Sequence, residues 1–374
     1  MINVIQILGD PTGGIRKHVH EIIKSSFEYG FNIHYIHGST LDSVAKIDIN
    51  EFKLKGVKAL LQNITKKPHV SDVKNIYTLV SYCRLNNINV IHGHGAKGGI
   101  YCRIVGLLAG VPSIYTPHGG SVHATFGRLE GFFYRTVERM LKPLTQLYLF
   151  ESNYTYKSFV NASGKLKPCK FVVNHNGIDI NSLSSVKHWM PQENNIINLL
   201  VVGVLREIKG QVVAIRALAK LIELRGMKFH LHFCGAGPDR DNLISSVNLY
   251  GLSDSVSFHG EVADVSQWYE MCNIVLIPSL FESFGYVAIE AALMRRPVVA
   301  SDCGGLLEII SNGETGYLFP VGDSDLLAAN ILSILENVVK SNGVVDAAEA
   351  RIREKFSSTV MLDKIFSAYR QVSS

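Results

Sequence analysis

Residues 274–292 have the sequence IVLIPSLFESFGYVAIEAA, and this stretch decides the fold. The apolar, β-branched run Ile274–Pro278 predicts a buried strand, and the segment from Gly285 onward predicts a helix. Glu282 lies in the loop between them. A strand that leads into a helix is the repeating unit of parallel α/β sheets, whose ligands bind where strands end and helices begin. We therefore expect functional residues directly after strands.

The same alternation of short apolar runs and helical patterns extends over the 374 residues. It predicts two sets of strands and thus two doubly wound α/β domains, with a polar linker at Asn176–Asn195 between them. The closing segment, Val345–Arg370, predicts helices that pack back across this linker. The predicted strands are Val4–Leu8, Asn32–Ile36, Val90–His92, Ser113–Thr116 and Leu147–Phe150, then Ile197–Val202, Phe229–Cys234, Val256–His259, Ile274–Pro278 and Val298–Ser301.

Composition excludes several classes of protein. Hydrophobic residues make up 47% of the chain and charged residues 18%, which is typical of a folded globular protein. No charge-free apolar stretch is long enough to span a bilayer, and the N-terminus resembles a strand rather than an export signal, so a cytoplasmic location is expected. The six cysteines are scattered without a C-x-x-C pair, and we interpret them as small buried apolar residues.

The positive charge is concentrated in the first half of the chain. Residues 1–190 carry 22 basic and 11 acidic side chains, whereas residues 191–374 carry 15 basic and 21 acidic ones. A basic half favours an anionic partner, such as a phosphorylated substrate, nucleic acid or an anionic lipid surface. The alternative is a solvated surface with a chance excess of cations.

The first predicted strand ends in Gly9-Asp10-Pro11-Thr12-Gly13-Gly14 and leads into a helix. Adjacent glycines allow a ligand to approach backbone amides at a helix N-terminus, where an anion such as phosphate is favoured. The pattern is not the G-x-G-x-x-G of dinucleotide folds, and the second strand does not end in an acidic residue. A turn that simply needs positive φ is the alternative.

Histidines follow two further strands, in His92-Gly93-His94-Gly95 and in Tyr115-Thr116-Pro117-His118-Gly119-Gly120. Beside glycines at strand ends they can exchange hydrogen bonds with a ligand near neutral pH, and His118 is the best candidate for a substrate contact. A structural histidine is the alternative. A metal site is disfavoured, because no carboxylate or fourth ligand lies in register with the three histidines.

The second half carries two glycine-bounded loops. Residues 203–210, GVLREIKG, place Arg206 and Lys209 after a strand, where they suit a diphosphate, although a solvated loop is equally compatible. Gly235 and Gly237 follow the next strand.

In the segment 279–292, Gly285, Tyr286 and Val287 offer helix N-terminal amides to an anion, while Glu282 and Glu290 suit sugar hydroxyls on either side of it.

The pattern from Glu282 to Glu290, with residues 300–308 (ASDCGGLLE) and 312–318 (NGETGYL), resembles family 4 of the retaining glycosyltransferases. The resemblance also covers Gly13-Gly14, residues 116–119, residues 176–179, Lys209-Gly210 and residues 235–238, and thus most of the chain. It implies the GT-B fold, in which two Rossmann-like domains face a cleft. The expected domains are residues 1–185 and 186–374, and a last helix at about 358–372 packs back on the N-terminal domain.

The resemblance implies roles for the site residues, with a nucleotide-diphosphate sugar, most often of UDP or GDP, on the C-terminal domain. Glu282 binds donor-sugar hydroxyls, Glu290 the ribose, and the amides of residues 285–287 the diphosphate, while Lys209 neutralises the leaving group. Gly14 adds an amide, His118 contacts the transferred sugar, and Gly13, His18 and His94 contact the acceptor. Arg206, Gly235 and Gly237 complete the donor set. One departure is Val204, which replaces the family's arginine after Gly203.

Retention of configuration in this family is explained by same-face attack, in which the leaving phosphate accepts the acceptor's proton. Catalysis is then electrostatic, so we expect neither a protein nucleophile nor a metal or other cofactor. Two D-x-D patterns, residues 239–241 and 323–325, stand where helices begin and are interpreted as N-caps rather than metal ligands.

The acceptor is expected to be a glycan or lipid-linked glycan of bacterial O-antigen, capsule or exopolysaccharide synthesis, which is the class that family members often extend. Residues 121–145 predict an amphipathic helix with flanking cations on the basic domain, able to lie on the inner face of the cytoplasmic membrane; a core-facing stripe is the alternative.

The remaining alternatives are a GT-B sugar-nucleotide epimerase and a nucleotide- or polyanion-binding module. Nucleic acid is not expected as a partner, because no aromatic and basic residues interleave on a predicted strand.

Overall fold

The computed structural model describes residues 1–39, 41, 43–65, 68–119, 128–183, 189–190, 196–223 and 228–373. These residues form two compact units. The first comprises Met1–Gly177 and the C-terminal segment that begins at Ser358, and the second comprises Ile178–Ser357. Two doubly wound α/β domains are thus confirmed, and the division falls after Gly177 rather than after residue 185.

Within the described residues, the first unit has a 7-stranded parallel sheet of order β3-β2-β1-β4-β5-β6-β7. Its central strands are buried on both faces because helices cover both sides, as parallel sheets require. The strands are β1 (Ile2–Leu8), β2 (Phe31–His37), β3 (Lys58–Leu61), β4 (Val90–His94), β5 (Ser113–Thr116), β6 (Leu147–Phe150) and β7 (Phe171–Val173).

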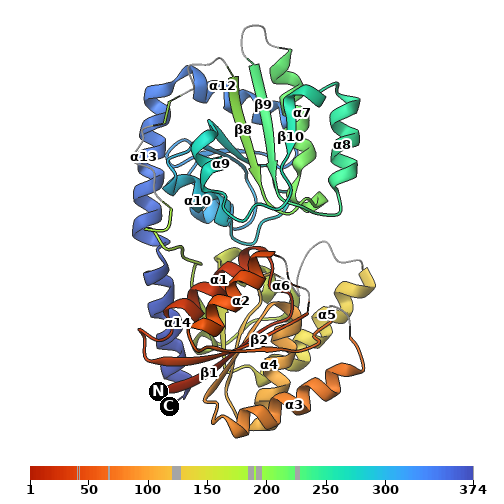
Figure 1. Cartoon of the computed structure of the whole chain (residues 1–374), viewed down its shortest axis with the longest axis vertical. Coiled ribbons are helices and arrows are strands. Elements are labelled where there is room, and N and C mark those ends of the chain that lie inside the picture. The colour runs from red at the N-terminus through yellow and green to blue at the C-terminus, as the bar shows by residue number, and fades with distance from the viewer. Residues whose placement is uncertain are drawn as a thin grey trace. The chain divides into compact units, whose positions relative to one another are not determined.

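The helices of the first unit include the last one of the chain. They are α1 (Gly13–Ser25), α2 (Ser43–Leu54), α3 (Ser71–Leu85), α4 (Gly95–Ala109), α5 (Arg128–Leu141), α6 (Asn153–Ser163) and α14 (Ser358–Ser373). Helix α14 buries Leu362, Ile365, Phe366 and Tyr369, a helical spacing of three and four, in the core formed with β1, β2 and β4. Figure 1 shows it beside α1, in blue among red elements. The predicted return of the C-terminal helix is confirmed.

The second unit has, within its described part, a 6-stranded parallel sheet of order β10-β9-β8-β11-β12-β13. Its strands are β8 (Ile196–Val202), β9 (Lys228–Cys234), β10 (Val256–Phe258), β11 (Ile274–Ile277), β12 (Val298–Ser301) and β13 (Tyr317–Phe319). Its helices are α7 (Gln211–Ile222), α8 (Arg240–Leu249), α9 (Ser266–Met271), α10 (Tyr286–Leu293), α11 (Leu306–Ile309), α12 (Ser324–Glu336) and α13 (Val338–Lys355).

Strand order places the ligand-binding edge of each sheet. In the first unit the order reverses between β1 and β4, and in the second between β8 and β11. The loops after such neighbouring strands diverge to opposite faces and leave a crevice at the carboxyl ends. The glycine turn after β1 and His94 at the end of β4 belong to the first of these edges, and Lys209 and Glu282 belong to the second.

Three sequence interpretations need correction. Part of the predicted linker is core instead, because Trp189 is fully buried in the second unit and its Nε1 donates to the Asn273 carbonyl at 2.6 Å. Cys169 is exposed and Cys303 is half-buried, whereas the other four cysteines are buried as expected. The edge strands β3, β7 and β13, of three or four residues each, were missed, although the equally short β10 was predicted.

Candidate functional site

The loops after β8 and β11 lie against each other at the switch point of the second sheet. The Leu280 amide donates to the Ile208 carbonyl at 2.9 Å. Gly210 has φ +62°, and a Cβ there would stand 2.0 Å from the Pro278 carbonyl oxygen, so a larger residue would push the loops apart. This approach brings Lys209 Nζ within 2.6 Å of Glu282 Oε2.

The Lys209–Glu282 pair remains open to solvent, because the two side chains are 33% and 16% exposed. Such a pair can exchange partners: an anion competes for the ammonium group, and a hydroxyl competes for the carboxylate. The cation predicted for a diphosphate and the carboxylate predicted for a sugar are therefore in direct contact. Arg206 is exposed on the same loop, as is Val204.

The backbone around Glu282 is held by two glycines after β12. Gly304 has φ +58°, and a Cβ there would lie 1.9 Å from the Glu282 carbonyl oxygen. The Gly305 amide donates to that same oxygen at 2.9 Å. Residues 303–305 thus fix the loop that carries Glu282. The two segments meet because β11 and β12, which precede them, are neighbours in the sheet.

Helix α10 begins immediately after this loop, with Gly285 as its N-cap at φ +119° and Tyr286 and Val287 in its first turn. Glu290, one turn further on, is buried, and its Oε2 accepts a hydrogen bond from Tyr269 Oη at 2.8 Å. Burial and the Glu290 carboxylate together raise the pKa of Tyr269 well above its usual value, so its hydroxyl stays a donor. The structure thus places Glu290 deeper than Glu282.

Gly235 and Gly237 allow the loop after β9 to lie on the loop after β8. A Cβ at Gly235 would stand 1.9 Å from the Gly203 carbonyl oxygen, and one at Gly237 would stand 2.2 Å from the Leu205 carbonyl oxygen. The Leu205 amide also donates to the Ala236 carbonyl at 3.0 Å. In the described structure these glycines therefore serve backbone contact between the two loops.

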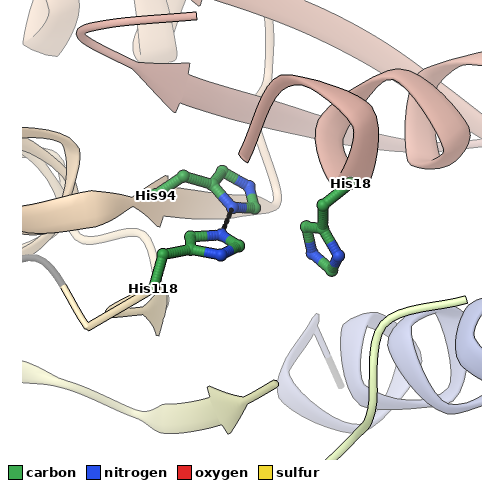
Figure 2. Close-up of side chains that lie close together, drawn as sticks. All are labelled: His18, His94 and His118. Carbon is green, nitrogen blue, oxygen red and sulfur yellow. Dashed lines mark hydrogen bonds between the residues drawn. The ribbon is translucent and has the colours of Figure 1, made fainter. Parts of the chain in front are cut away.

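In the first unit, three histidines converge from different elements (Figure 2). His18 projects from α1, His94 ends β4, and His118 follows β5 with an unusual φ of +50°. One ring nitrogen from each lies within 4.8 Å of the other two, and all three side chains are buried. His94 Nδ1 and His118 Nε2 are 3.2 Å apart.

The outer nitrogens of two of these histidines have fixed partners. His118 Nδ1 forms an ion pair with Glu151, which directly follows β6 and is 3% exposed. His94 Nε2 lies 2.7 Å from Gln6 Oε1, and Gln6 Nε2 donates to Tyr369 Oη at 2.7 Å. Burial lowers the pKa of His94 well below its usual value, with further lowering from the neighbouring histidines, so this ring is neutral near pH 7.

His18 differs from the other two. Neither of its ring nitrogens meets a partner with hydrogen-bond geometry, although Asn176 is close enough to act on its pKa. Burial, followed by the charge of His118, lowers the pKa of His18 well below its usual value. Its ring centroid lies 5.1 Å from that of His118 and 5.5 Å from that of His94. Gly13 starts the same helix at φ +59°, followed by Gly14, as the predicted turn requires.

Two family models match consecutive parts of the chain. The model described as "Glycosyltransferase Family 4" matches residues 12–182, and the model described as "Glycosyl transferases group 1" matches residues 188–351. The chain belongs to the family 4 glycosyltransferases.

The relatives of this glycosyltransferase include enzymes of bacterial polysaccharide synthesis. It is 29% identical over 174 residues to N-acetyl-alpha-D-glucosaminyl L-malate synthase of Bacillus anthracis, covering 46% of this chain and 44% of that protein. It is 23% identical over 312 residues to the capsular polysaccharide biosynthesis glycosyltransferase CapM of Staphylococcus aureus, covering 80% and 81%. The alignment with the first of these spans less than half of that relative's length.

The GT-B fold is confirmed by solved structures. Anabaena HepE, crystallised in complex with UDP and glucose, superposes with a TM-score of 0.85 at 20% identity, covering 99% of this chain and 100% of that one. At this identity the likeness concerns the fold of the glycosyltransferase. The epimerase and binding-module alternatives raised from the sequence lose their basis with the family assignment.

Glu151 is the residue of this glycosyltransferase that sequence reasoning missed. The argument against a metal site was that no carboxylate or fourth ligand lies in register with the histidines; Glu151 does lie beside His118, but at its outer Nδ1 and not at the nitrogen that faces His94. The signal was available: Glu151 directly follows β6, the neighbour of β5, and the ends of adjacent parallel strands lie together. The metal-ligand interpretation also included His92, but His92 instead bonds Tyr369 Oη and Thr116 Oγ1, at 2.7 and 2.8 Å.

The predicted amphipathic helix is α5, which in the glycosyltransferase exposes Phe132, Phe133 and Met140. Two of the predicted surface cations, Arg139 and Lys142, instead form hydrogen bonds within the unit. Both donate to carbonyls at the C-terminal end of α6. Phe126 lies outside the described residues, as do the side chains of Arg128 and Leu129. Among the helices described, none has the length and apolar character to cross a bilayer.

The two D-x-D patterns both stand at helix starts. Asp323 is the N-cap of α12, and its Oδ1 accepts hydrogen bonds from the amides of Asp325 and Leu326 at 3.0 and 2.9 Å. Asp239 occupies the N-cap position of α8 without a side-chain cap bond. The N-cap interpretation is confirmed for residues 323–325. For residues 239–241 only the position at a helix start agrees with it.

Proposed function

We propose that this glycosyltransferase transfers a hexosyl unit from a nucleotide-diphosphate sugar, of UDP or GDP, to a glycan or lipid-linked glycan during synthesis of a bacterial surface polysaccharide, with retention of anomeric configuration. The observation that carries the proposal is the Lys209–Glu282 pair at the switch point of the second sheet. It unites a cation for a leaving diphosphate with a carboxylate for sugar hydroxyls. The relationship to CapM supports the polysaccharide class.

Donor binding follows from the same edge of the second unit. The positive end of the α10 macrodipole, at Gly285, Tyr286 and Val287, attracts the diphosphate, and Lys209 and Arg206 supply its counter-charges. Glu282 accepts from sugar hydroxyls and Glu290 from the ribose. Gly235 and Gly237 shape the floor of this loop cluster, and Gly14 adds a backbone amide.

The first unit supplies the acceptor side. His118 contacts the transferred sugar, and its ion pair with Glu151 fixes the orientation of the ring. His94, His18 and Gly13 contact the acceptor. Transfer uses no metal, since the cations named above stabilise the charge that develops on the departing diphosphate.

Nucleotide stabilisation tests the donor. In EDTA, one of UDP, GDP, ADP and dTDP is expected to raise the melting temperature of the chain, by the equivalent of about 2.7 kcal/mol at a hundred times its Kd. Glu290→Gln is expected to lose this shift, because the amide offers its NH₂ group where the ribose hydroxyls need an acceptor.

Tyr269→Phe is the matched control, because it removes the partner of Glu290 but leaves the carboxylate in place. It should keep the nucleotide shift even if its own melting temperature falls. A wild-type chain that none of the four nucleotides stabilises in EDTA, but one does with Mg²⁺, would contradict metal-independent donor binding.

Membrane association is the further part of the proposal. Helix α5 combines exposed Phe132, Phe133 and Met140 with a basic unit, which suits the interface of an anionic bilayer. The chain is expected to float with phosphatidylglycerol vesicles at low salt and to be released at high salt. Phe132→Ser/Phe133→Ser should weaken flotation, whereas Leu249→Ser, at an 81% exposed site on α8, should not. Equal flotation of both variants would argue against docking through α5.

A further inference from the structure

We propose that His18, His94 and His118 form a binding site for a transition-metal ion of the Zn²⁺ type, and that the bound ion inhibits the enzyme. The site itself stands on the geometry of the first unit alone. The inhibition rests on the proposed function, because it depends on the role given to His118. The site is unrelated to the diphosphate of the donor, which needs no metal.

The distances suit a metal with nitrogen ligands. Two nitrogens bound to a tetrahedral Zn²⁺ at about 2.1 Å lie about 3.4 Å from each other. His94 Nδ1 and His118 Nε2 are 3.2 Å apart, and the nitrogen of His18 lies within 4.8 Å of both. The His18 nitrogen would move closer to the other two when an ion binds, and this would complete a site of three histidine ligands.

The hydrogen bonds at the outer nitrogens decide which way the lone pairs point. Gln6 Nε2 donates to Tyr369, so Gln6 Oε1 accepts from His94 Nε2–H, and His94 Nδ1 then carries the lone pair. His118 Nδ1 is in ion-pair contact with Glu151, and this leaves His118 Nε2 as the nitrogen that faces His94 Nδ1. The lone pair of His94 Nδ1 therefore faces His118 Nε2 at 3.2 Å, where either a proton of His118 or a metal ion bound to both nitrogens can satisfy it.

The same outer partners match the surroundings of known metal sites. A metal-bound histidine usually donates its second ring N–H to a carboxylate or a carbonyl oxygen, which orients the ring and raises its basicity. Gln6 Oε1 occupies this position at His94, and the Glu151 carboxylate lies against the outer nitrogen of His118. Both partners are buried, so the arrangement is rigid.

His18 supplies the observation that a hydrogen-bonded pair alone would not explain. Its side chain is 3% exposed, and neither ring nitrogen has a hydrogen-bond partner in the described structure. A buried polar group without a partner costs free energy, and a metal ion would satisfy it. With three imidazoles and no carboxylate in the ligand set, the site selects Zn²⁺, Co²⁺, Ni²⁺ or Cu²⁺ over Mg²⁺ and Ca²⁺.

The experiment uses the full chain without a histidine tag and Co²⁺ as a spectroscopic probe, in the absence of any sugar nucleotide. We expect one Co²⁺ per chain, with the strong visible d–d absorption of a tetrahedral site, displaced by Zn²⁺ but not by Mg²⁺. His18→Gln is the main variant, because the glutamine keeps a polar side chain beside Asn176, the neighbour that partly offsets the lowering of the His18 pKa by burial. It should weaken binding at least tenfold, and Glu151→Gln should weaken it about 10–100-fold.

His20→Gln is the matched control, because His20 lies on the same helix but faces Asp48 and Glu51. It should bind Co²⁺ as the wild type does. A wild-type chain that binds no Co²⁺ tightly, or equal binding by wild type and His18→Gln, would overturn the site. Micromolar Zn²⁺ should then lower kcat in the wild type but not in His18→Gln. Binding without inhibition would uphold the metal site and overturn the role of His118 in transfer.

Discussion

The Lys209→Ala variant is expected to lose about 10²–10³-fold in kcat, because it removes the cation that faces the charge developing on the leaving diphosphate. The loss should appear mainly in kcat rather than in KM, since that charge is greatest in the transition state. The change also leaves Glu282 without the partner that holds its carboxylate 2.6 Å away. Steady-state kinetics with the nucleotide sugar identified by thermal shift measure both effects.

Lys220→Ala is the control for Lys209→Ala. Lys220 lies near the far end of α7 and pairs with Asp325, so its loss should leave kcat unchanged. Glu282→Gln and the double variant complete a cycle: if the pair acts as a unit, the double variant should be little worse than the worse single one. A Lys209→Ala enzyme within about threefold of the wild type in kcat would contradict the role given to this lysine.

Arg103→Met is expected to lower the free energy of unfolding by about 3–5 kcal/mol, because it leaves a carboxylate buried without its cation. Arg103 on α4 is fully buried and binds both oxygens of Glu138 on α5, at 2.6 and 3.2 Å. Tyr115 Oη also donates to this carboxylate, at 3.1 Å, but a neutral donor cannot balance its charge. Denaturant unfolding followed by circular dichroism measures the change.

Two further variants show whether the charge is responsible. Arg103→Met/Glu138→Leu removes both charges and should recover much of the lost stability, since an apolar pair of similar volume needs no counter-ion. Lys55→Ala breaks the exposed pair with Glu51 and should cost less than about 1 kcal/mol. Equal losses in Arg103→Met and Lys55→Ala would show that the buried pair contributes no more than a surface one.

The fold was predictable because its signal is local. Most strands are an apolar run followed by a turn and a helix, and β5, β6 and β12, of four residues each, begin and end at the predicted residues. The motif residues then fall at the correct edge of each sheet without any knowledge of distances. Trp189 was assigned to the linker because its neighbours in the sequence are polar. Its burial depends on distant residues, namely Asn273 and the core of the second unit, which the local sequence does not show.

The candidate sites were predictable residue by residue but not as pairs. Lys209 and Glu282 were assigned to different groups of the donor, and their contact depends on how closely the glycines allow two loops to approach. Glu151 and Tyr369 were missed because neither stands in a recognisable motif, and each reaches the histidines only through the order of the strands or through α14. Relations of this kind between distant segments carry no periodic signal in a single sequence.

The position of α14 has a consequence for how the protein is made. The second unit is complete once Ser357 has left the ribosome, whereas the first unit still lacks the helix whose Phe366 stacks on Phe31 at 4.9 Å. The half that is synthesised first is therefore the half that finishes folding last. Until α14 has left the ribosome, the apolar surface over β1 and β2 stays open to chaperones or to association with other nascent chains.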